Sequence, residues 1–163
     1  MVLRNRPVPV TLPHPALPGA DWADCYELLV PGNGLTATLA ARRTIGDFPG
    51  WVRALMWLRN AIVRPFGLKG SGPSSTREMI GIFPVLSRSD EQMVLGFDDT
   101  HLDFRIVVDV RPAGDTQQAV NVTTLVHRKI LLGKIYLAVI TPFHRLIVRT
   151  MLDRLSRPTV AAS

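Results

Sequence analysis

The sequence of 163 residues has little of several features that often decide what a protein does. It contains one cysteine, Cys25, which excludes both a disulfide within the chain and a cysteine-based metal cluster. The longest apolar run, 130–140, includes Lys134 and is far shorter than the ~18 residues of a membrane span. Arg4 and Arg6 are followed by proline-rich sequence and not by the apolar core of a secretory signal, so we expect a cytoplasmic protein.

Specific functional motifs are also missing from the sequence. We find no glycine-rich phosphate loop, no zinc-ligand spacing and no nucleophilic serine motif, and we therefore expect neither a metal nor a cofactor. Aromatic residues make up only 7% of the chain and are not interleaved with the basic ones. Because stacking aromatics among basic residues are typical of nucleic-acid-binding surfaces, we do not expect nucleic acid as a partner.

What the chain does have is an ordinary globular composition with an uneven charge. Apolar residues make up 47% and charged residues 20%, as in a domain with one hydrophobic core. Residues 71–127 contain four basic and eight acidic residues, whereas 128–157 contain seven basic residues and Asp153. The surplus of basic charge is explained either by solvated helix faces or by attraction to an anionic membrane or an acidic partner.

The order of secondary structure can be predicted from residue patterns. Residues 1–19 hold five prolines and predict an extended arm, the folded domain is expected over 20–157, and 158–163 are expected to be disordered. An apolar run predicts a first strand at Cys25–Val30. Helical spacing and breaker residues predict two short helices, Thr36–Ile45 and Gly50–Pro65.

A series of antiparallel strands is predicted next. Met79–Leu86 is apolar, but Pro84 inside it indicates an edge or bulged strand. Gln92–Phe97 follows, and then apolar residues alternate with polar ones over Leu102–Val110, the pattern of a half-buried strand. In the last strand one face is expected to hold Val120, Val122, Thr124 and Val126.

A long amphipathic helix, Leu131–Ser156, is predicted to end the fold. More than half of its circumference is apolar, which is typical of a helix held within a curved surface. Pro142 cannot donate a hydrogen bond and predicts a kink near Ala138–Thr141. The stripe expected to be buried is Leu132, Tyr136, Val139, Phe143, Ile147, Met151 and Leu155, flanked by Ile140, Leu146 and Val148.

These elements indicate an α+β helix-grip fold, in which a curved antiparallel sheet wraps around the long kinked helix. Three segments, Pro49–Lys69, Gly96–Val108 and Thr141–Leu152, resemble the DUF2867 family, a domain of unknown function. The resemblance implies a START-like, polyketide-cyclase-related domain. Some members follow a nucleotide-binding Rossmann domain for which quinone binding has been suggested, but this chain has no GxGxxG segment, so that association is not transferred.

Two polar groups are candidates for catalysis. His101, Asp103 and Arg105 share one face of the alternating strand, opposite Phe104. They predict an ion-pair ladder facing solvent, with a general base at His101 as the alternative. His144, at the edge of the buried arc of the last helix, is either a structural residue or an acid–base group in a cavity.

Three functional hypotheses follow from this fold. The first is binding of a small apolar molecule, such as a lipid-like, isoprenoid, quinone or aromatic compound, in a cavity beneath the last helix. The second is a cyclase- or hydratase-type enzyme that uses a cavity histidine. The third is a partner-binding protein with a packed core, such as a homodimer. The predicted ligand-binding residues are Tyr136, Ile140, Phe143, His144, Ile147, Phe104 and Trp57.

Overall fold

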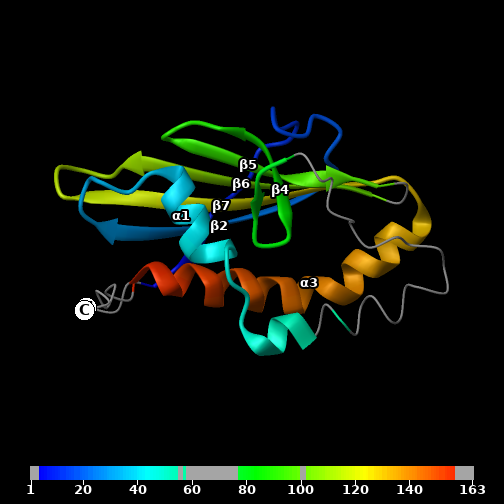
Figure 1. The fold of residues 1–163 in the computed structure, drawn as a ribbon. Helices are drawn as coiled ribbons and strands as arrows, with labels where there is room; N and C mark the ends of the chain where they lie inside the picture. The colour runs from blue at the N-terminus through cyan, green and yellow to red at the C-terminus, as the bar shows by residue number, and fades with distance from the viewer. Residues whose placement is uncertain (1–3, 55–56, 58–76, 100–101, 157–163) are drawn as a thin grey trace.

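The computed structural model describes residues 4–54, 57, 77–99 and 102–156, and it is an α+β fold (Figure 1). The helices whose bounds lie within these residues are α1 (Ala37–Ile45), α3 (Leu131–Leu152) and the short 3-10 helix η2 (Asp153–Ser156). The strands are β1 (Arg6–Pro7), β2 (Trp22–Pro31), β3 (Met79–Ile80), β4 (Phe83–Arg88), β5 (Gln92–Asp98), β6 (Leu102–Pro112) and β7 (Gln117–Arg128).

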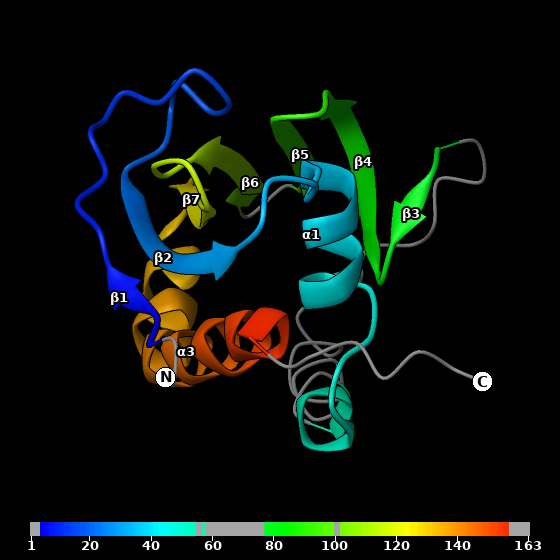
Figure 2. The same cartoon turned by 90° about the vertical axis from the view of Figure 1, so that its left-hand side faces the viewer.

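All the strands join one antiparallel sheet, in the order β1-β2-β7-β6-β5-β4-β3. Seen end-on, the sheet curves, and α1 and α3 lie on its concave side (Figure 2). The segment around Pro84 is an edge of the sheet, as predicted, with a register shift between Val85 and Ser87. It is divided at Gly81, whose φ of 61° makes the turn between β3 and β4 and favours glycine.

The concave side, called the inner face here, carries the main hydrophobic core. Ile106, Val108 and Val110 of β6 are buried there, as the alternation predicted. Val120 and Val122 of β7 continue this core, with α1 and the C-terminal half of α3 packed against it. The predicted faces of both strands are therefore confirmed.

The convex side, called the outer face here, is covered in part by the N-terminal arm. Leu17 of the arm and Ala20, which follows the arm, pack with Val94, Val107 and Leu125 in a second hydrophobic cluster. The proline-rich segment thus lies along the body of the protein. Figure 1 shows it above the sheet, on the side opposite α3.

The first predicted helix is confirmed as α1. The Thr36 side chain accepts a hydrogen bond from the Leu39 N–H at 3.3 Å, the usual N-cap interaction, and Gly46 follows the last turn. Of the second predicted helix, residues 50–54 and 57 are helical, and the remainder lies outside the described residues.

Helix α3 begins at Leu131 as predicted and continues into η2. It contains Pro142 and bends, so that its N-terminal part rises toward the sheet (Figure 1). The predicted buried stripe is only partly right. Met151 is buried, but Val139 and Phe143 are 65% and 47% exposed, because the inward side of the helix is rotated toward Leu137, Val148 and Leu152. Because the apolar residues cover more than half of the helix, the sequence could not predict which of them face the sheet.

Candidate functional site

Two adjoining apolar pockets lie between the inner face of the sheet and α3. The α1 pocket, of about 150 Å³, is lined by the end of α1 and the C-terminal half of α3. The Tyr136 pocket, of about 200 Å³, lies toward the start of α3. Both are lined by Phe83, Phe104, Thr124, His144 and Ile147, so these five side chains form the boundary between the pockets.

Strand pairing brings two polar residues together on the inner face, and one of them, Thr124, lines both pockets. Asp24 of β2 and Thr124 of β7 are directly opposite in the ladder. Facing residues of an antiparallel pair have Cβ atoms about 4.5–5.5 Å apart, so both side chains reach the same part of the inner face. From α3, His144 reaches this point and its Nε2 lies 3.2 Å from Asp24 Oδ1.

The contact between His144 and Asp24 determines which ring nitrogen of the histidine carries the proton. A carboxylate only accepts hydrogen bonds, so Nε2 must carry a proton, and in the neutral ring Nδ1 is then the acceptor. The ring is also held by Trp22, at a centroid separation of 5.7 Å and an interplanar angle of 74°. His144 is thus an oriented imidazole in a largely apolar wall.

Two polar atoms at this point are buried without a hydrogen-bond partner. They are Asp24 Oδ2 and the Thr124 hydroxyl oxygen. The Thr124 residue is only 2% exposed. A buried hydroxyl without a partner costs about 1–3 kcal/mol, so an incoming polar group would gain from bonding to it.

The structure places the predicted ligand-binding residues in two groups. Tyr136, Ile140 and the boundary residues Phe104, His144 and Ile147 line the pockets. Phe143 is 47% and Trp57 is 72% exposed, and neither is among the residues that line them. The candidate His101 lies outside the described residues.

The candidate Asp103 lies on the outer face, away from the pockets. Its carboxylate forms an ion pair with Lys129 at 2.6 Å and approaches His127 Nδ1 at 3.4 Å. Burial acts to raise the pKa of Asp103, but the hydrogen bond and charge of Lys129, with a contribution from His127, outweigh it and lower the pKa. Asp103 is thus ion-paired on the outer face, but its partners are Lys129 and His127 and not the Arg105 of the predicted ladder.

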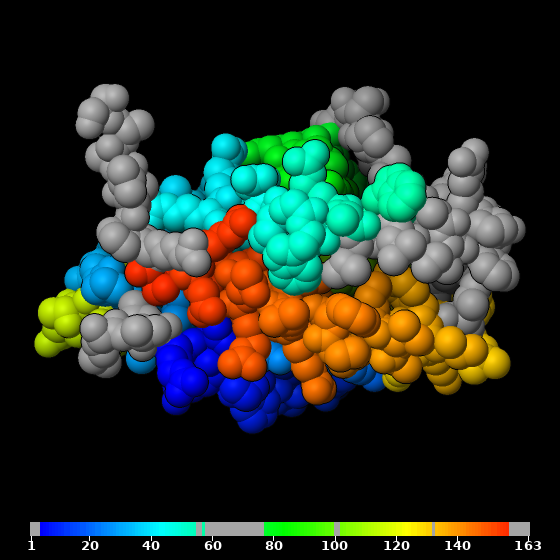
Figure 3. All heavy atoms as spheres, turned by 90° about the horizontal axis from the view of Figure 1, so that it is seen from below, coloured from blue at the N-terminus to red at the C-terminus, as the bar shows by residue number. Residues whose placement is uncertain are grey.

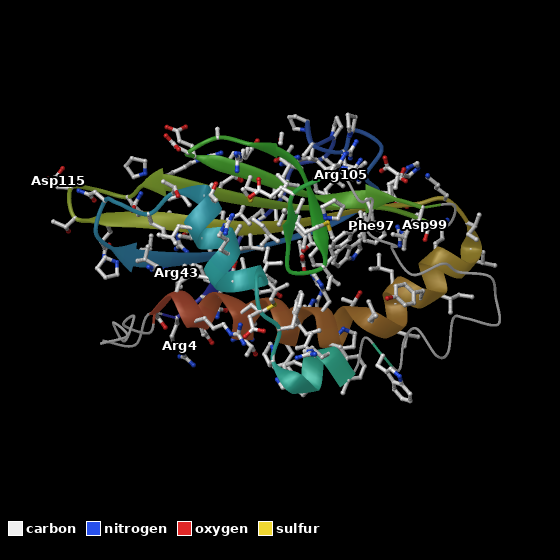
Figure 4. All side chains as sticks on the ribbon, in the orientation of Figure 1. Arg4, Arg43, Phe97, Asp99, Arg105 and Asp115 are labelled. Carbon is white, nitrogen blue, oxygen red and sulfur yellow. The ribbon has the colours of Figure 1, made fainter. Side chains whose placement is uncertain are left out.

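A second outer-face ion pair involves Arg105. It contacts Asp98 at 2.7 Å and donates to the carbonyl oxygen of Phe97 at 3.0 Å, and Figure 4 shows Arg105 and Phe97 at the same end of the sheet. The Arg105 side chain is only 13% exposed, less than expected for a residue facing solvent. Its charge holds strand ends together and contributes nothing to the pockets.

The sequence analysis did not identify Asp24, and for Thr124 it predicted only the strand face on which the residue lies. Asp24 is 120 positions from His144, and no local pattern links them. For Thr124, the available signal was a hydroxyl within an otherwise apolar strand face.

Cys25, next to Asp24, is buried, and burial raises the pKa of its thiol, so it is not a nucleophile at neutral pH.

Fold and site together define an α+β protein with a long terminal helix across a curved antiparallel sheet and an apolar cavity between them. Among the residues that the structure describes, no group of three or more histidine, cysteine or acidic side chains could hold a metal ion. The chain belongs to the family described as "Protein of unknown function (DUF2867)", whose model matches residues 16–151. None of the curated proteins matches the chain.

Proposed function

We propose that this protein binds a small apolar molecule with one polar group in the two pockets beneath α3. The observation that carries the proposal is a buried, unpartnered Thr124 hydroxyl in a wall that both pockets share. Apolar area supplies the affinity in such sites, and a few polar groups orient the ligand. A carbonyl or hydroxyl on the ligand would bond to Thr124, and His144 stands beside it.

The size of the cavity limits the ligand. Neither pocket alone, at about 150 and 200 Å³, reaches the ~300 Å³ that is common for ligand sites. A molecule larger than a single ring would therefore have to span both pockets across the boundary residues. Isoprenoid, quinone-like and aromatic compounds have the elongated apolar shape that this requires.

A second candidate function is acid–base catalysis of the cyclase or hydratase type. The pairing of His144 with Asp24 favours it, because a carboxylate that orients an imidazole is a common arrangement of a general base. In that case Nδ1 of His144 would accept a proton from the bound molecule. The arrangement of a long helix within a curved sheet also supports our assignment of a helix-grip, START-like fold.

A fluorescent apolar probe, N-phenyl-1-naphthylamine, tests the binding function. Trp22 lines the Tyr136 pocket, so with Trp51 and Trp57 replaced by phenylalanine it becomes the reporter. We expect saturable quenching of Trp22 as the probe brightens. Absence of saturable binding by this and by a longer isoprenoid alcohol would contradict the proposal.

A matched pair of variants locates the binding. Ile147→Phe adds volume at the boundary of both pockets, and we expect at least about tenfold weaker probe binding. Leu146→Phe makes a similar change on the neighbouring residue, which is 56% exposed and does not line the pockets. Equal effects of the two substitutions would place the probe elsewhere.

A further inference from the structure

The exposed side of α3 has a feature that the pocket function does not use. Five apolar side chains lie along it, each at least 47% exposed. These residues, called the apolar face of α3 here, are Leu131, Ile135, Val139, Phe143 and Leu146. Their spacing of three or four residues puts them on one side of the helix over about four turns. Contiguous exposed apolar surface of this kind marks an interaction site.

Basic residues border the apolar face. At about 3.6 residues per turn, Lys134, Arg145 and Arg149 follow one edge of it, and all three are exposed. The helix Leu131–Leu152 has no acidic residue. Among the described residues, neither Lys134 nor Arg145 forms an ion pair. An apolar stripe with a cationic edge is the pattern of a helix that lies in the surface of an anionic membrane.

Exposed tryptophans lie on the same side of the molecule. Seen from below, α3 crosses this side and residues 50–54 and 57 lie next to it (Figure 3). That neighbouring segment contains Trp51 and Trp57, which are 40% and 72% exposed. Tryptophan is enriched at membrane interfaces because its ring is apolar and its N–H is polar. The second segment thus extends the same surface.

We propose that α3, with the neighbouring tryptophans, docks this protein on the surface of an anionic lipid membrane. Charge favours this occupant over a second copy of the chain, since two copies meeting through this side would bring their basic residues together. The proposal does not require that the pockets be occupied. Phe143 and Ile147, one turn apart, connect the apolar face to the pockets, so a membrane-dissolved apolar ligand would be close to its site.

The helix lies on the membrane in this proposal and does not cross it. By length and hydropathy alone, Gly133–Ser156 could span a bilayer, although the uninterrupted apolar run in the sequence is much shorter. In the most apolar window of this helix, 22% is buried inside the protein. However, His144 contacts Asp24, and the Arg149 Nε donates to the Asn5 side chain at 3.1 Å, so the helix is bound to the rest of the fold. Spanning would break these contacts and place Arg145 and Arg149 in hydrocarbon.

Co-sedimentation of the full chain with lipid vesicles tests the docking. We expect binding to phosphatidylcholine vesicles that contain about 30% phosphatidylserine at about 0.1 M salt, and much weaker binding to phosphatidylcholine alone. The double variant Ile135→Ser/Val139→Ser should bind at least about tenfold more weakly. Each of Lys134→Gln and Arg145→Gln should lower binding about fivefold.

Matched controls are available on other parts of the surface. Leu12→Ser changes a 38% exposed apolar residue of the N-terminal arm, and Arg111→Gln removes a charge whose side chain is 72% exposed. Neither should alter vesicle binding, and circular dichroism should show that all variants are folded.

Three results would overturn the proposal. The first is no binding to the anionic vesicles, which leaves the pocket function intact because the probe titration is independent. The second is binding that responds to charge but not to Ile135→Ser/Val139→Ser, which indicates adsorption without docking of the apolar face. The third is a dimer in analytical ultracentrifugation that Ile135→Ser/Val139→Ser dissociates, together with no vesicle binding, which assigns the face to a second copy.

Discussion

The two faces of the sheet use the same strands in different ways. On the outer face, a packed cluster around Leu125 lies under the arm, and Asp103 and Arg105 both have charged partners. On the inner face, two pockets remain, and Thr124 and Asp24 each leave a buried oxygen without a partner. A buried oxygen without a partner also occurs on the outer face, at Asn121, so the two faces differ in packing and not in unsatisfied polar groups. The outer face is covered in part by the arm, whereas the inner face leaves space beside Thr124.

The largest expected effect concerns packing on the two faces. Leu125 on the outer face and Leu152 beside the α1 pocket are both fully buried. We predict that Leu125→Ala lowers the free energy of unfolding by about 4 kcal/mol and Leu152→Ala by about 2–3 kcal/mol. A side chain next to a void has already lost part of its packing contacts, so its truncation costs less. Urea denaturation measures both values, and a larger loss at Leu152 would contradict the comparison.

The next effect concerns the pair of His144 and Asp24 on the inner face. We predict that His144→Ala destabilises the protein by about 2 kcal/mol, because it leaves the Asp24 carboxylate buried without its partner. In an Asp24→Ala background the same substitution should cost about 1 kcal/mol less. Equal costs in both backgrounds, measured by thermal unfolding, would show that the pair has no coupling.

Two adjacent threonines allow a matched test of the two faces. Thr123 is hydrogen-bonded with Cys25 on the outer face, whereas the inner hydroxyl of Thr124 has no partner. Thr123→Val should therefore destabilise the ligand-free protein by about 1 kcal/mol, and Thr124→Val should leave it unchanged or up to about 1 kcal/mol more stable. For probes with a polar group, only Thr124→Val should weaken binding. The opposite order of stabilities would remove the argument for a ligand at Thr124.

The smallest effect is a pH dependence on the outer face. Because the pKa of Asp103 is lower in the folded protein than in the unfolded chain, its ion pair stabilises the fold above the unfolded pKa of about 3.9. This contribution is lost as the pH falls through the folded pKa. Asp103→Asn should cost less than about 1 kcal/mol at pH 7, and the difference from wild type should vanish in acid.

Much of the fold could be predicted from local patterns. The alternation in β6, the extent of α1 and the start of α3 each depend on a few neighbouring residues, and the structure confirms them. The orientation of α3 could not be predicted, because its apolar residues cover more than half of its circumference. One part of them packs on the sheet, and the other part forms the exposed apolar face.

The candidate site was only partly predictable for a similar reason. His144 was a candidate because a histidine interrupts an apolar helix face. Its partner Asp24 is on the strand that pairs with the last strand of the sheet, and only the register Asp24↔Thr124 reveals the cluster. Long-range pairing of this kind leaves no mark in the local sequence. Asp103 attracted attention for its polar neighbours, but strand alternation turns it away from the pockets.

The central claim is that the inner face holds an apolar molecule, and native mass spectrometry of freshly purified protein tests it most directly. The protein should carry a stoichiometric added mass that organic extraction releases as an apolar compound with a polar group, and Ile147→Phe should lose it. A bare mass for the wild type, together with no added mass after incubation with isoprenoid, quinone and aromatic compounds, would contradict the claim.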